Sequence, residues 1–210
     1  MIIVAFAGLA RGGKTTAANY LYDWCLEHGL NPIRMSFAKP MKDAAARIGL
    51  TKDKDPKKYR AVLQRWGESR RDPNYKPGIT GENYWVERAI MNLLRMANAE
   101  QEDYKHKDKY EFTSCWKETV AIFDDVRYMN ELEMITEMGG TTVFIDGMAR
   151  IKDMDADWRK HESESMAMMY SYGRLPDIFD YYVNNNYDEE TLEKLVEHLA
   201  PAWLDMEIMS

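Results

Sequence analysis

"MIIVAFAGLARGGKTT", residues Met1–Thr16, decides the fold of this chain. The apolar, β-branched run Met1–Ala7 ends at a glycine, which predicts a short buried strand. Gly8–Thr15 then match the pattern G-x-x-x-x-G-K-S/T in full, and a helical pattern begins directly behind them. A strand, a glycine-rich loop and a helix in this order predict a loop that wraps phosphate groups.

Each residue type in this loop has a chemical reason. The glycines let backbone N–H groups turn inward around phosphate oxygens, and the first turn of the helix points its positive end at the same anion. Lys14 would neutralise the β- and γ-phosphates, and the hydroxyl of Thr15 would be a Mg²⁺ ligand. We therefore expect Mg²⁺ and ATP as the phosphate donor. The expected ATP-binding residues in this segment are Gly8, Arg11, Gly12, Gly13, Lys14, Thr15 and Thr16.

The remaining chain alternates between strand and helix patterns. Predicted strands cover residues 32–38, 118–127, 141–147 and 180–185. Predicted helices cover residues 14–29, 40–49, 59–71, 82–100, 130–140, 165–172 and 188–200, and a polar loop is expected at 101–112. This alternation predicts an α/β fold, a mostly parallel sheet with helices on both faces.

We expect one domain over residues 1–210. Its core would comprise 1–50, 83–147 and 166–210, interrupted by an excursion at 51–82 and a charged, irregular segment at 148–165. No internal repeat or low-complexity tract is visible.

Composition limits the function. The chain carries a net charge of −7 and has a pI of about 5.2, which argues against an extended nucleic-acid surface. The two cysteines, Cys25 and Cys115, belong to no metal-binding pattern. We see no signal peptide and no apolar run long enough to span a membrane, so we expect a cytoplasmic protein.

A second set of candidate residues follows the strand "VAIFDDVR". Asp124 and Asp125 end this strand and Arg127 comes just after it. A carboxylate at the end of a strand beside the phosphate loop can reach Mg²⁺, its waters or an acceptor group. The alternative is an aspartate that caps the helix near Asn130. The residues themselves do not choose between Asp124 and Asp125.

Arginines form the third set. Arginine binds phosphate as a bidentate fork, so the cluster Arg60, Arg65, Arg70 and Arg71 would suit an acceptor that carries a phosphate. Arg150, Arg159 and Lys160 lie in the charged segment 148–165, which would serve as a lid over the transferring group. An exposed charged loop is the equally weighted alternative for that segment.

Taken together, the chain resembles the deoxynucleoside monophosphate kinases of tailed bacteriophages, a branch of the P-loop nucleoside monophosphate kinases. The resemblance rests on stretches that span nearly the whole chain in the family's order. These are "FAGLARGGKTTAANYL", "SFAKPMKDAA", "LQRWGESRR…YWVERA", "DDVRYMNELEMITEMGGTTVFID" and "HESE…DYYVNNNYDEETLEKLVEHL". The third and fourth are more specific than the phosphate loop, which many families share.

The resemblance implies an adenylate-kinase-like, parallel five-stranded sheet, with the nucleoside monophosphate bound by the excursion at 51–82 and a lid at 148–165. It implies Mg·ATP as donor and a (deoxy)nucleoside 5′-monophosphate as acceptor, frequent dimerisation, and the host cytoplasm as location. Asn184 would lie near the donor base, and Arg150 stands where the family often has an Arg-Pro-Gly segment, here "GMAR". The implied acceptor residues are Gln64, Arg65, Gly67, Arg70 or Arg71, Trp85, Asp124 and Arg127, and the implied catalytic residues are Lys14, Asp125, Arg127 and Arg150.

We expect the metal at Thr15 and Asp124, and either Arg150 or Arg159 as the lid arginine. Two alternatives stay open for the function. One is a P-loop kinase that acts on a modified base or nucleotide within DNA, which the acidic pI disfavours. The other is a nucleotide-binding module without turnover, which would not need the paired aspartates or the arginines.

Overall fold

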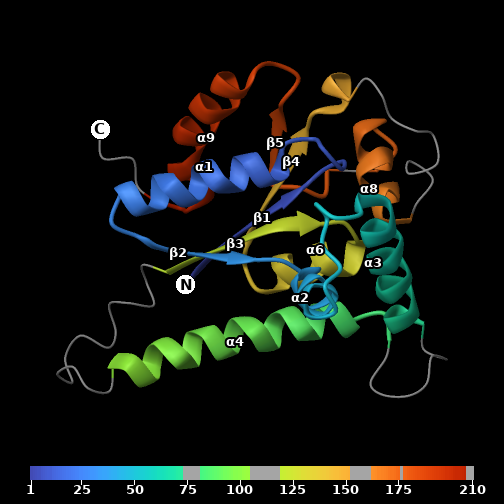
Figure 1. Ribbon diagram of the computed structural model, residues 1–210. Coiled ribbons are helices and arrows are strands. Elements are labelled where there is room, and N and C mark those ends of the chain that lie inside the picture. Colours follow the sequence, from blue (N-terminus) through green and yellow to red (C-terminus); the bar gives the residue numbers. More distant parts are fainter. Residues whose placement is uncertain (73–80, 105–118, 152–161, 176, 207–210) are drawn as a thin grey trace. The chain divides into compact units, whose positions relative to one another are not determined.

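The computed structural model describes all residues except 73–80, 105–118, 152–161, 176 and 207–210 (Figure 1). The chain forms two compact units. Unit 1 comprises Met1–Arg34 and Tyr104–Ser210, and unit 2 comprises Met35–Asp103. The described part of the expected excursion at 51–82 belongs to unit 2, and the division into core, excursion and lid stays a prediction.

The sheet has five parallel strands in the order β2-β3-β1-β4-β5. β1 is central and pairs with β3 and with β4, so the loop after β1 leaves from the middle of the sheet. This arrangement confirms the predicted adenylate-kinase-like α/β fold. The strands are β1 (Ile2–Ala7), β2 (Asn31–Met35), β3 (Thr119–Val126), β4 (Thr141–Asp146) and β5 (Tyr181–Asn184).

Helices cover both faces of the sheet because its central strands are apolar on both sides. The ring of Phe6 on β1 packs 5.5 Å from the fully buried Trp203. The ring of Phe144 on β4 packs 4.6 Å from Tyr170 on the other face. The first face carries α1 (Lys14–Glu27) and α9 (Glu189–Trp203), which lie side by side (Figure 1), and the second carries α6 (Met129–Glu137) and α8 (Glu162–Ser171).

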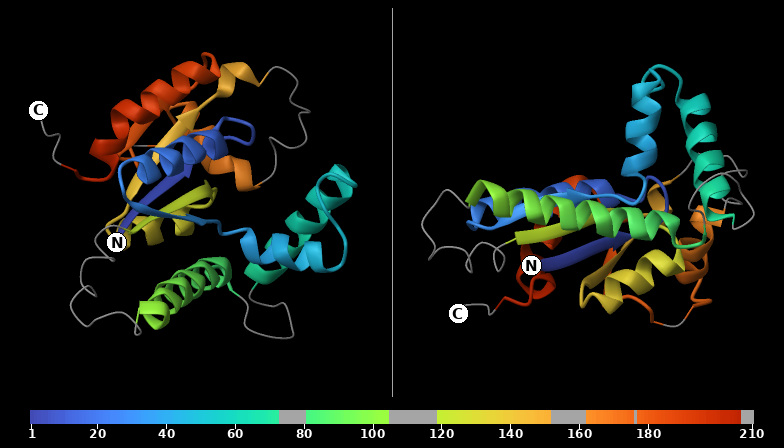
Figure 2. Two further views of the ribbon diagram at one scale, coloured as in Figure 1. Left: turned by 60° about the vertical axis from the view of Figure 1, so that its left-hand side comes forward. Right: turned by 90° about the horizontal axis from the view of Figure 1, so that it is seen from below.

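Unit 2 consists of α2 (Lys39–Arg47), α3 (Pro56–Arg71) and α4 (Tyr84–Tyr104), and Figure 2 shows α2 and α3 lying side by side. α3 begins where Asp55 caps it, with its Oδ1 accepting the Lys58 N–H at 3.0 Å, and Pro56 occupies the first helical position. Gly67 is buried in α3, and its carbonyl accepts a hydrogen bond from the indole of Trp85 at 3.1 Å.

Several boundaries differ from expectation. β2 ends at Met35, α4 continues to Tyr104 into the predicted loop 101–112, and α8 begins at Glu162 inside the predicted lid. α9 also passes through Pro201, because the buried Trp203 beyond it packs into the core. Within the described part of the chain, no helix is long and apolar enough to cross a bilayer.

Candidate active site

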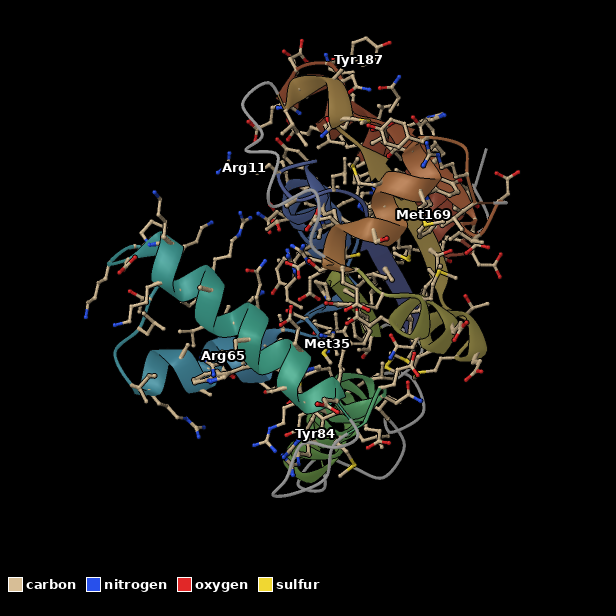
Figure 3. The ribbon with its side chains drawn as sticks, turned by 90° about the vertical axis from the view of Figure 1, so that its right-hand side faces the viewer. Arg11, Met35, Arg65, Tyr84, Met169 and Tyr187 are labelled. Carbon is tan, nitrogen blue, oxygen red and sulfur yellow. The ribbon has the colours of Figure 1, made fainter. Side chains whose placement is uncertain are left out.

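The predicted phosphate-binding loop occupies residues 8–13, between β1 and α1, and its backbone needs glycine at two positions. Gly8 has a φ of 139° and Gly13 a φ of 101°, both in the region that other residues rarely adopt. A Cβ at Gly8 would lie 2.3 Å from the carbonyl oxygen of Ile145, and one at Gly13 would lie 2.1 Å from Nδ2 of Asn185. Arg11 also has a positive φ, 66°, and is exposed; Figure 3 shows its side chain projecting from the loop.

Lys14 begins α1 and bends back over the loop. Its Nζ donates hydrogen bonds of 2.8 Å to the carbonyl oxygens of Gly8 and Leu9, and the residue is only 5% exposed. Burial is the main reason why the pKa of Lys14 falls from 10.5 to about 7, and the positive charge of Arg127 lowers it further. Three carboxylates, of Glu164, Asp125 and Asp124, act in the opposite direction. Lys14 therefore lies within a cluster of predicted site residues.

A β-bulge explains how both aspartates come close to Lys14. Ala5 pairs with Phe123 and Ala7 with Val126, so Asp124 and Asp125 together stand opposite one residue of β1. A bulge re-aims side chains that would otherwise alternate strictly between the two faces of the sheet. The consequence is that both aspartates influence Lys14 electrostatically.

The two aspartates have different surroundings. Oδ2 of Asp124 accepts a hydrogen bond of 2.5 Å from Arg34, whose guanidinium also donates one of 2.5 Å to Asn19 on α1. Asp125 is more deeply buried, at 8% exposure. Arg34 was not among the predicted site residues, because an isolated arginine in a strand pattern gives no signal.

Arg127 follows β3 and is held at both its backbone and its side chain. Its N–H donates 2.8 Å to Oε2 of Glu131, which also accepts the N–H of Tyr128 and thereby caps α6. Its guanidinium pairs with Glu164 of α8. The second oxygen of Glu164 accepts the N–H of Ala10 in the phosphate loop at 2.8 Å. Glu164 was also missed, although it lies in the quoted stretch "HESE".

Asn185 ties the loop to the chain after β5. It is 1% exposed, its Nδ2 donates 2.8 Å to the carbonyl of Gly12, and its Oδ1 accepts 3.0 Å from Arg150. Arg150 lies in a short 3-10 turn, η1 (Met148–Arg150). The resemblance implied that the neighbouring Asn184 would lie near the donor base. Asn184 is exposed, and its Oδ1 accepts hydrogen bonds from Asn186 in the same turn. The roles predicted for Asn184 and Arg150 remain predictions, and Arg159 lies outside the described residues.

Unit 2 contains a cavity of about 620 Å³ between α2, α3 and α4. Two predicted acceptor residues, Arg70 and Trp85, line it. The guanidinium carbons of Arg70 and Arg88 lie 5.6 and 5.5 Å from the ring centre of Tyr84, labelled in Figure 3. Further lining residues that sequence reasoning missed are Lys39, Arg47, Trp66, Arg88 and Arg95.

Other predicted acceptor residues lie elsewhere in unit 2. Arg65 lines a separate cavity of about 540 Å³ beside the end of α2, and Figure 3 shows its side chain on the α2 side of α3. Arg71 lies close to Gly67. A Cβ added to Gly67 would lie 3.2 Å from a guanidinium nitrogen of Arg71. Gln64 is half-buried on α3 and Arg60 lies one turn earlier. Of the predicted arginine cluster, Arg65 and Arg70 therefore line different cavities.

No protein-family model and no curated protein matches this chain. Among solved structures, shikimate kinase from Acinetobacter baumannii in complex with shikimate is 10% identical, with a TM-score of 0.47 over 99% of this chain and 96% of that one. Shikimate kinase from Bacteroides thetaiotaomicron is 14% identical, with a TM-score of 0.45 over 98% of this chain and 99% of that one. APE1195 is 15% identical, with a TM-score of 0.42 over 97% of this chain and 96% of that one. These likenesses are too distant to bear on the substrate.

Proposed function

We propose that this chain is an ATP-dependent kinase that transfers a phosphoryl group to a (deoxy)nucleoside 5′-monophosphate. The observation that carries the proposal is the position of Arg127 in the same charged cluster as Lys14 of the phosphate loop. A loop that only holds a triphosphate has no need of this second cation. An arginine fork beside it suits an acceptor that brings a phosphate of its own.

The loop supplies the donor site. The positive φ values of Gly8 and Gly13 suit a loop whose backbone N–H groups would face the phosphates, and Lys14 would balance their charge. Near neutral pH the amine of Lys14 is close to its pKa of about 7, and a bound polyphosphate would favour the charged form.

A magnesium ion fits the residues present at this site. Mg²⁺ usually binds through one or two protein oxygens and takes its other ligands from phosphates and water. The hydroxyl of Thr15 and the carboxylate of Asp124 would supply such a pair. When bound, the ion would neutralise charge on the transferred group.

The cavity between α2, α3 and α4 in unit 2 has a lining that suits a nucleotide. Lys39, Arg47, Arg70, Arg88 and Arg95 line it together with a single carboxylate, that of Asp43. The aromatic rings of Trp66, Tyr84 and Trp85 also line it. Cations and flat rings together suit a ligand with a phosphate and a base.

The proposed chemistry needs no general base. An anionic oxygen of the acceptor's phosphate forms a bond to the γ-phosphorus while the bond to the β–γ bridging oxygen breaks. The products are ADP and a nucleoside diphosphate. Catalysis then consists of positioning the two ligands and stabilising charge.

The test measures ADP release from Mg·ATP across a panel of ribo- and deoxynucleoside 5′-monophosphates. We expect one or a few of them to stimulate release, and Lys14→Ala to lower it about a hundredfold or more. Lys194→Ala is the matched control, because Lys194 is exposed on α9 and pairs with Glu190, one turn away. ATP binding without stimulation by any monophosphate would overturn the proposal. Labelling of DNA would then indicate the polymeric acceptor, and its absence a module without turnover.

A further inference from the structure

Glu164 is a buried carboxylate with an unusual pair of partners. It lies in the first turn of α8 and is 3% exposed. One of its oxygens accepts the N–H of Ala10 in the phosphate loop at 2.8 Å, and the other accepts from the guanidinium of Arg127. A single side chain therefore joins α8, the phosphate loop and the chain after β3.

Packing alone does not account for this residue. A buried carboxylate is unfavourable by several kcal/mol unless it is paired and hydrogen-bonded. The neighbouring Met166 and Ala167 already bury the apolar side of α8. An apolar residue at position 164 would serve the same packing without that penalty, so the charge calls for a role of its own.

The partner on which Glu164 acts is Arg127. An arginine side chain loses rotamer entropy when it is held in one geometry. The side chain of Arg127 is 33% exposed, whereas that of Glu164 is 4% exposed. The buried carboxylate is thus the fixed member of the pair, and it is anchored to the phosphate loop by the Ala10 N–H.

We propose that Glu164 is a positioning residue that holds the guanidinium of Arg127 beside the phosphate loop, where Arg127 binds the acceptor's phosphate. This role rests on the proposed function. It predicts that Glu164 affects use of the acceptor through Arg127 and leaves binding of the donor nearly unchanged.

The test compares Glu164→Gln with Glu162→Gln, which removes the same charge from an exposed position in the same helical turn. For Glu164→Gln we expect the KM of the monophosphate turned over in the panel to rise about tenfold or more, with the Kd of ATP changed less than about threefold. Glu162→Gln should behave as wild type. Tighter ATP binding in Glu164→Gln would overturn the proposal, because it would mean that Glu164 competes with the phosphates of ATP for the N–H of Ala10.

A double-mutant cycle separates positioning from a general loss of structure. If Glu164 acts through Arg127, the variant Arg127→Met/Glu164→Gln should be no worse than Arg127→Met alone. Independent, additive losses would overturn the proposal. Should Glu164→Gln fold poorly, Glu164→Asp keeps the charge but withdraws it by one methylene, and it should show the same rise in KM.

A readout without turnover distinguishes failure of this inference from failure of the proposed function. The Nε–H resonance of Arg127 in the ¹⁵N NMR spectrum, assigned by its loss in Arg127→Lys, should be sharp in the wild-type chain and in Glu162→Gln. It should broaden or vanish through solvent exchange in Glu164→Gln. An unchanged resonance would overturn the positioning role even if the kinase activity is found. A changed resonance with no monophosphate turned over would refute only the proposed function.

Discussion

The side-chain amide of Asn185 donates a 2.8 Å hydrogen bond to the carbonyl oxygen of Gly12, so the segment after β5 supports the phosphate-binding loop. The backbone N–H of Asn185 is fixed in turn by the carbonyl of Asp146 at 2.7 Å. Its Oδ1 accepts from Arg150. The buried amide of Asn185 therefore links the phosphate loop to Arg150, a predicted lid arginine.

Asn185→Ala should therefore loosen the loop. The carbonyl of Gly12 loses its partner, and we expect the free energy of unfolding to fall by about 1–3 kcal/mol. ATP affinity measured by calorimetry should fall with it. In Asn184→Ala, which alters the exposed neighbour, the free energy of unfolding should change by less than about 1 kcal/mol. Equal unfolding curves for Asn185→Ala and the wild type would contradict the claim that Asn185 stabilises the loop through Gly12.

Gly147 lies outside the phosphate-loop pattern but presses against it. A Cβ at this position would come within 2.6 Å of the carbonyl oxygen of Gly12, although its φ of −110° suits any residue. Gly147→Ala should therefore displace the loop and lower ATP affinity about tenfold or more. Gly139→Ala is the control: its φ of 70° is strained, but nothing lies within 4 Å of the new methyl group. Loss of stability without loss of ATP affinity in Gly147→Ala would refute this explanation.

The lowered pKa of Lys14 predicts how stability depends on pH. The folded chain releases the proton of Lys14 near pH 7, whereas the unfolded chain holds it to about pH 10.5. The unfolded state therefore binds more protons between these values, and stability contributed by this group rises with pH across that window. Lys14→Met removes the effect, so the wild type should gain stability relative to Lys14→Met from pH 7 to 9.5 in urea unfolding. Lys194→Met should run parallel to the wild type. If the wild type instead loses stability relative to Lys14→Met over this pH range, the pKa of Lys14 is shifted in the opposite direction.

The different surroundings of Asp124 and Asp125 separate their predicted roles. Asp124→Asn should raise the Mg²⁺ concentration needed for half-maximal turnover about tenfold, because an amide is a weaker ligand than a carboxylate. Asp125→Asn should lower kcat with little change in this Mg²⁺ requirement. The measurement is a Mg²⁺ titration at saturating ATP and monophosphate. A reversed pattern would assign the metal to Asp125.

Cys25 should be chemically inert in the folded chain. Burial in the core between α1 and α9 raises the pKa of its thiol to about 12, and the residue has no measurable exposure. In Cys115→Ser, where Cys25 is the remaining cysteine, a thiol reagent at pH 8 should label the chain only through its small unfolded fraction. Addition of urea should speed labelling in proportion to the unfolded fraction. Fast labelling without denaturant would contradict this burial.

The fold was predictable because its signals are local. An apolar run and a glycine-rich pattern of fixed spacing determine β1, the loop and α1, since the groups that bind phosphate are neighbours along the chain. The strand of "VAIFDDVR" was predicted for the same reason. The end of α9 was not, because packing of Trp203 outweighs a proline near a helix end.

The sequence by itself determined the phosphate loop, the class of fold and the candidate residues Lys14, Asp124, Asp125 and Arg127. Only the tertiary structure decided which side chains support them. Glu164 meets Ala10 across 154 residues of chain, and Asn185 meets Gly12 across 173. Such pairs depend on the strand order, which brings distant segments to one edge of the sheet. No local spacing in the sequence encodes that proximity.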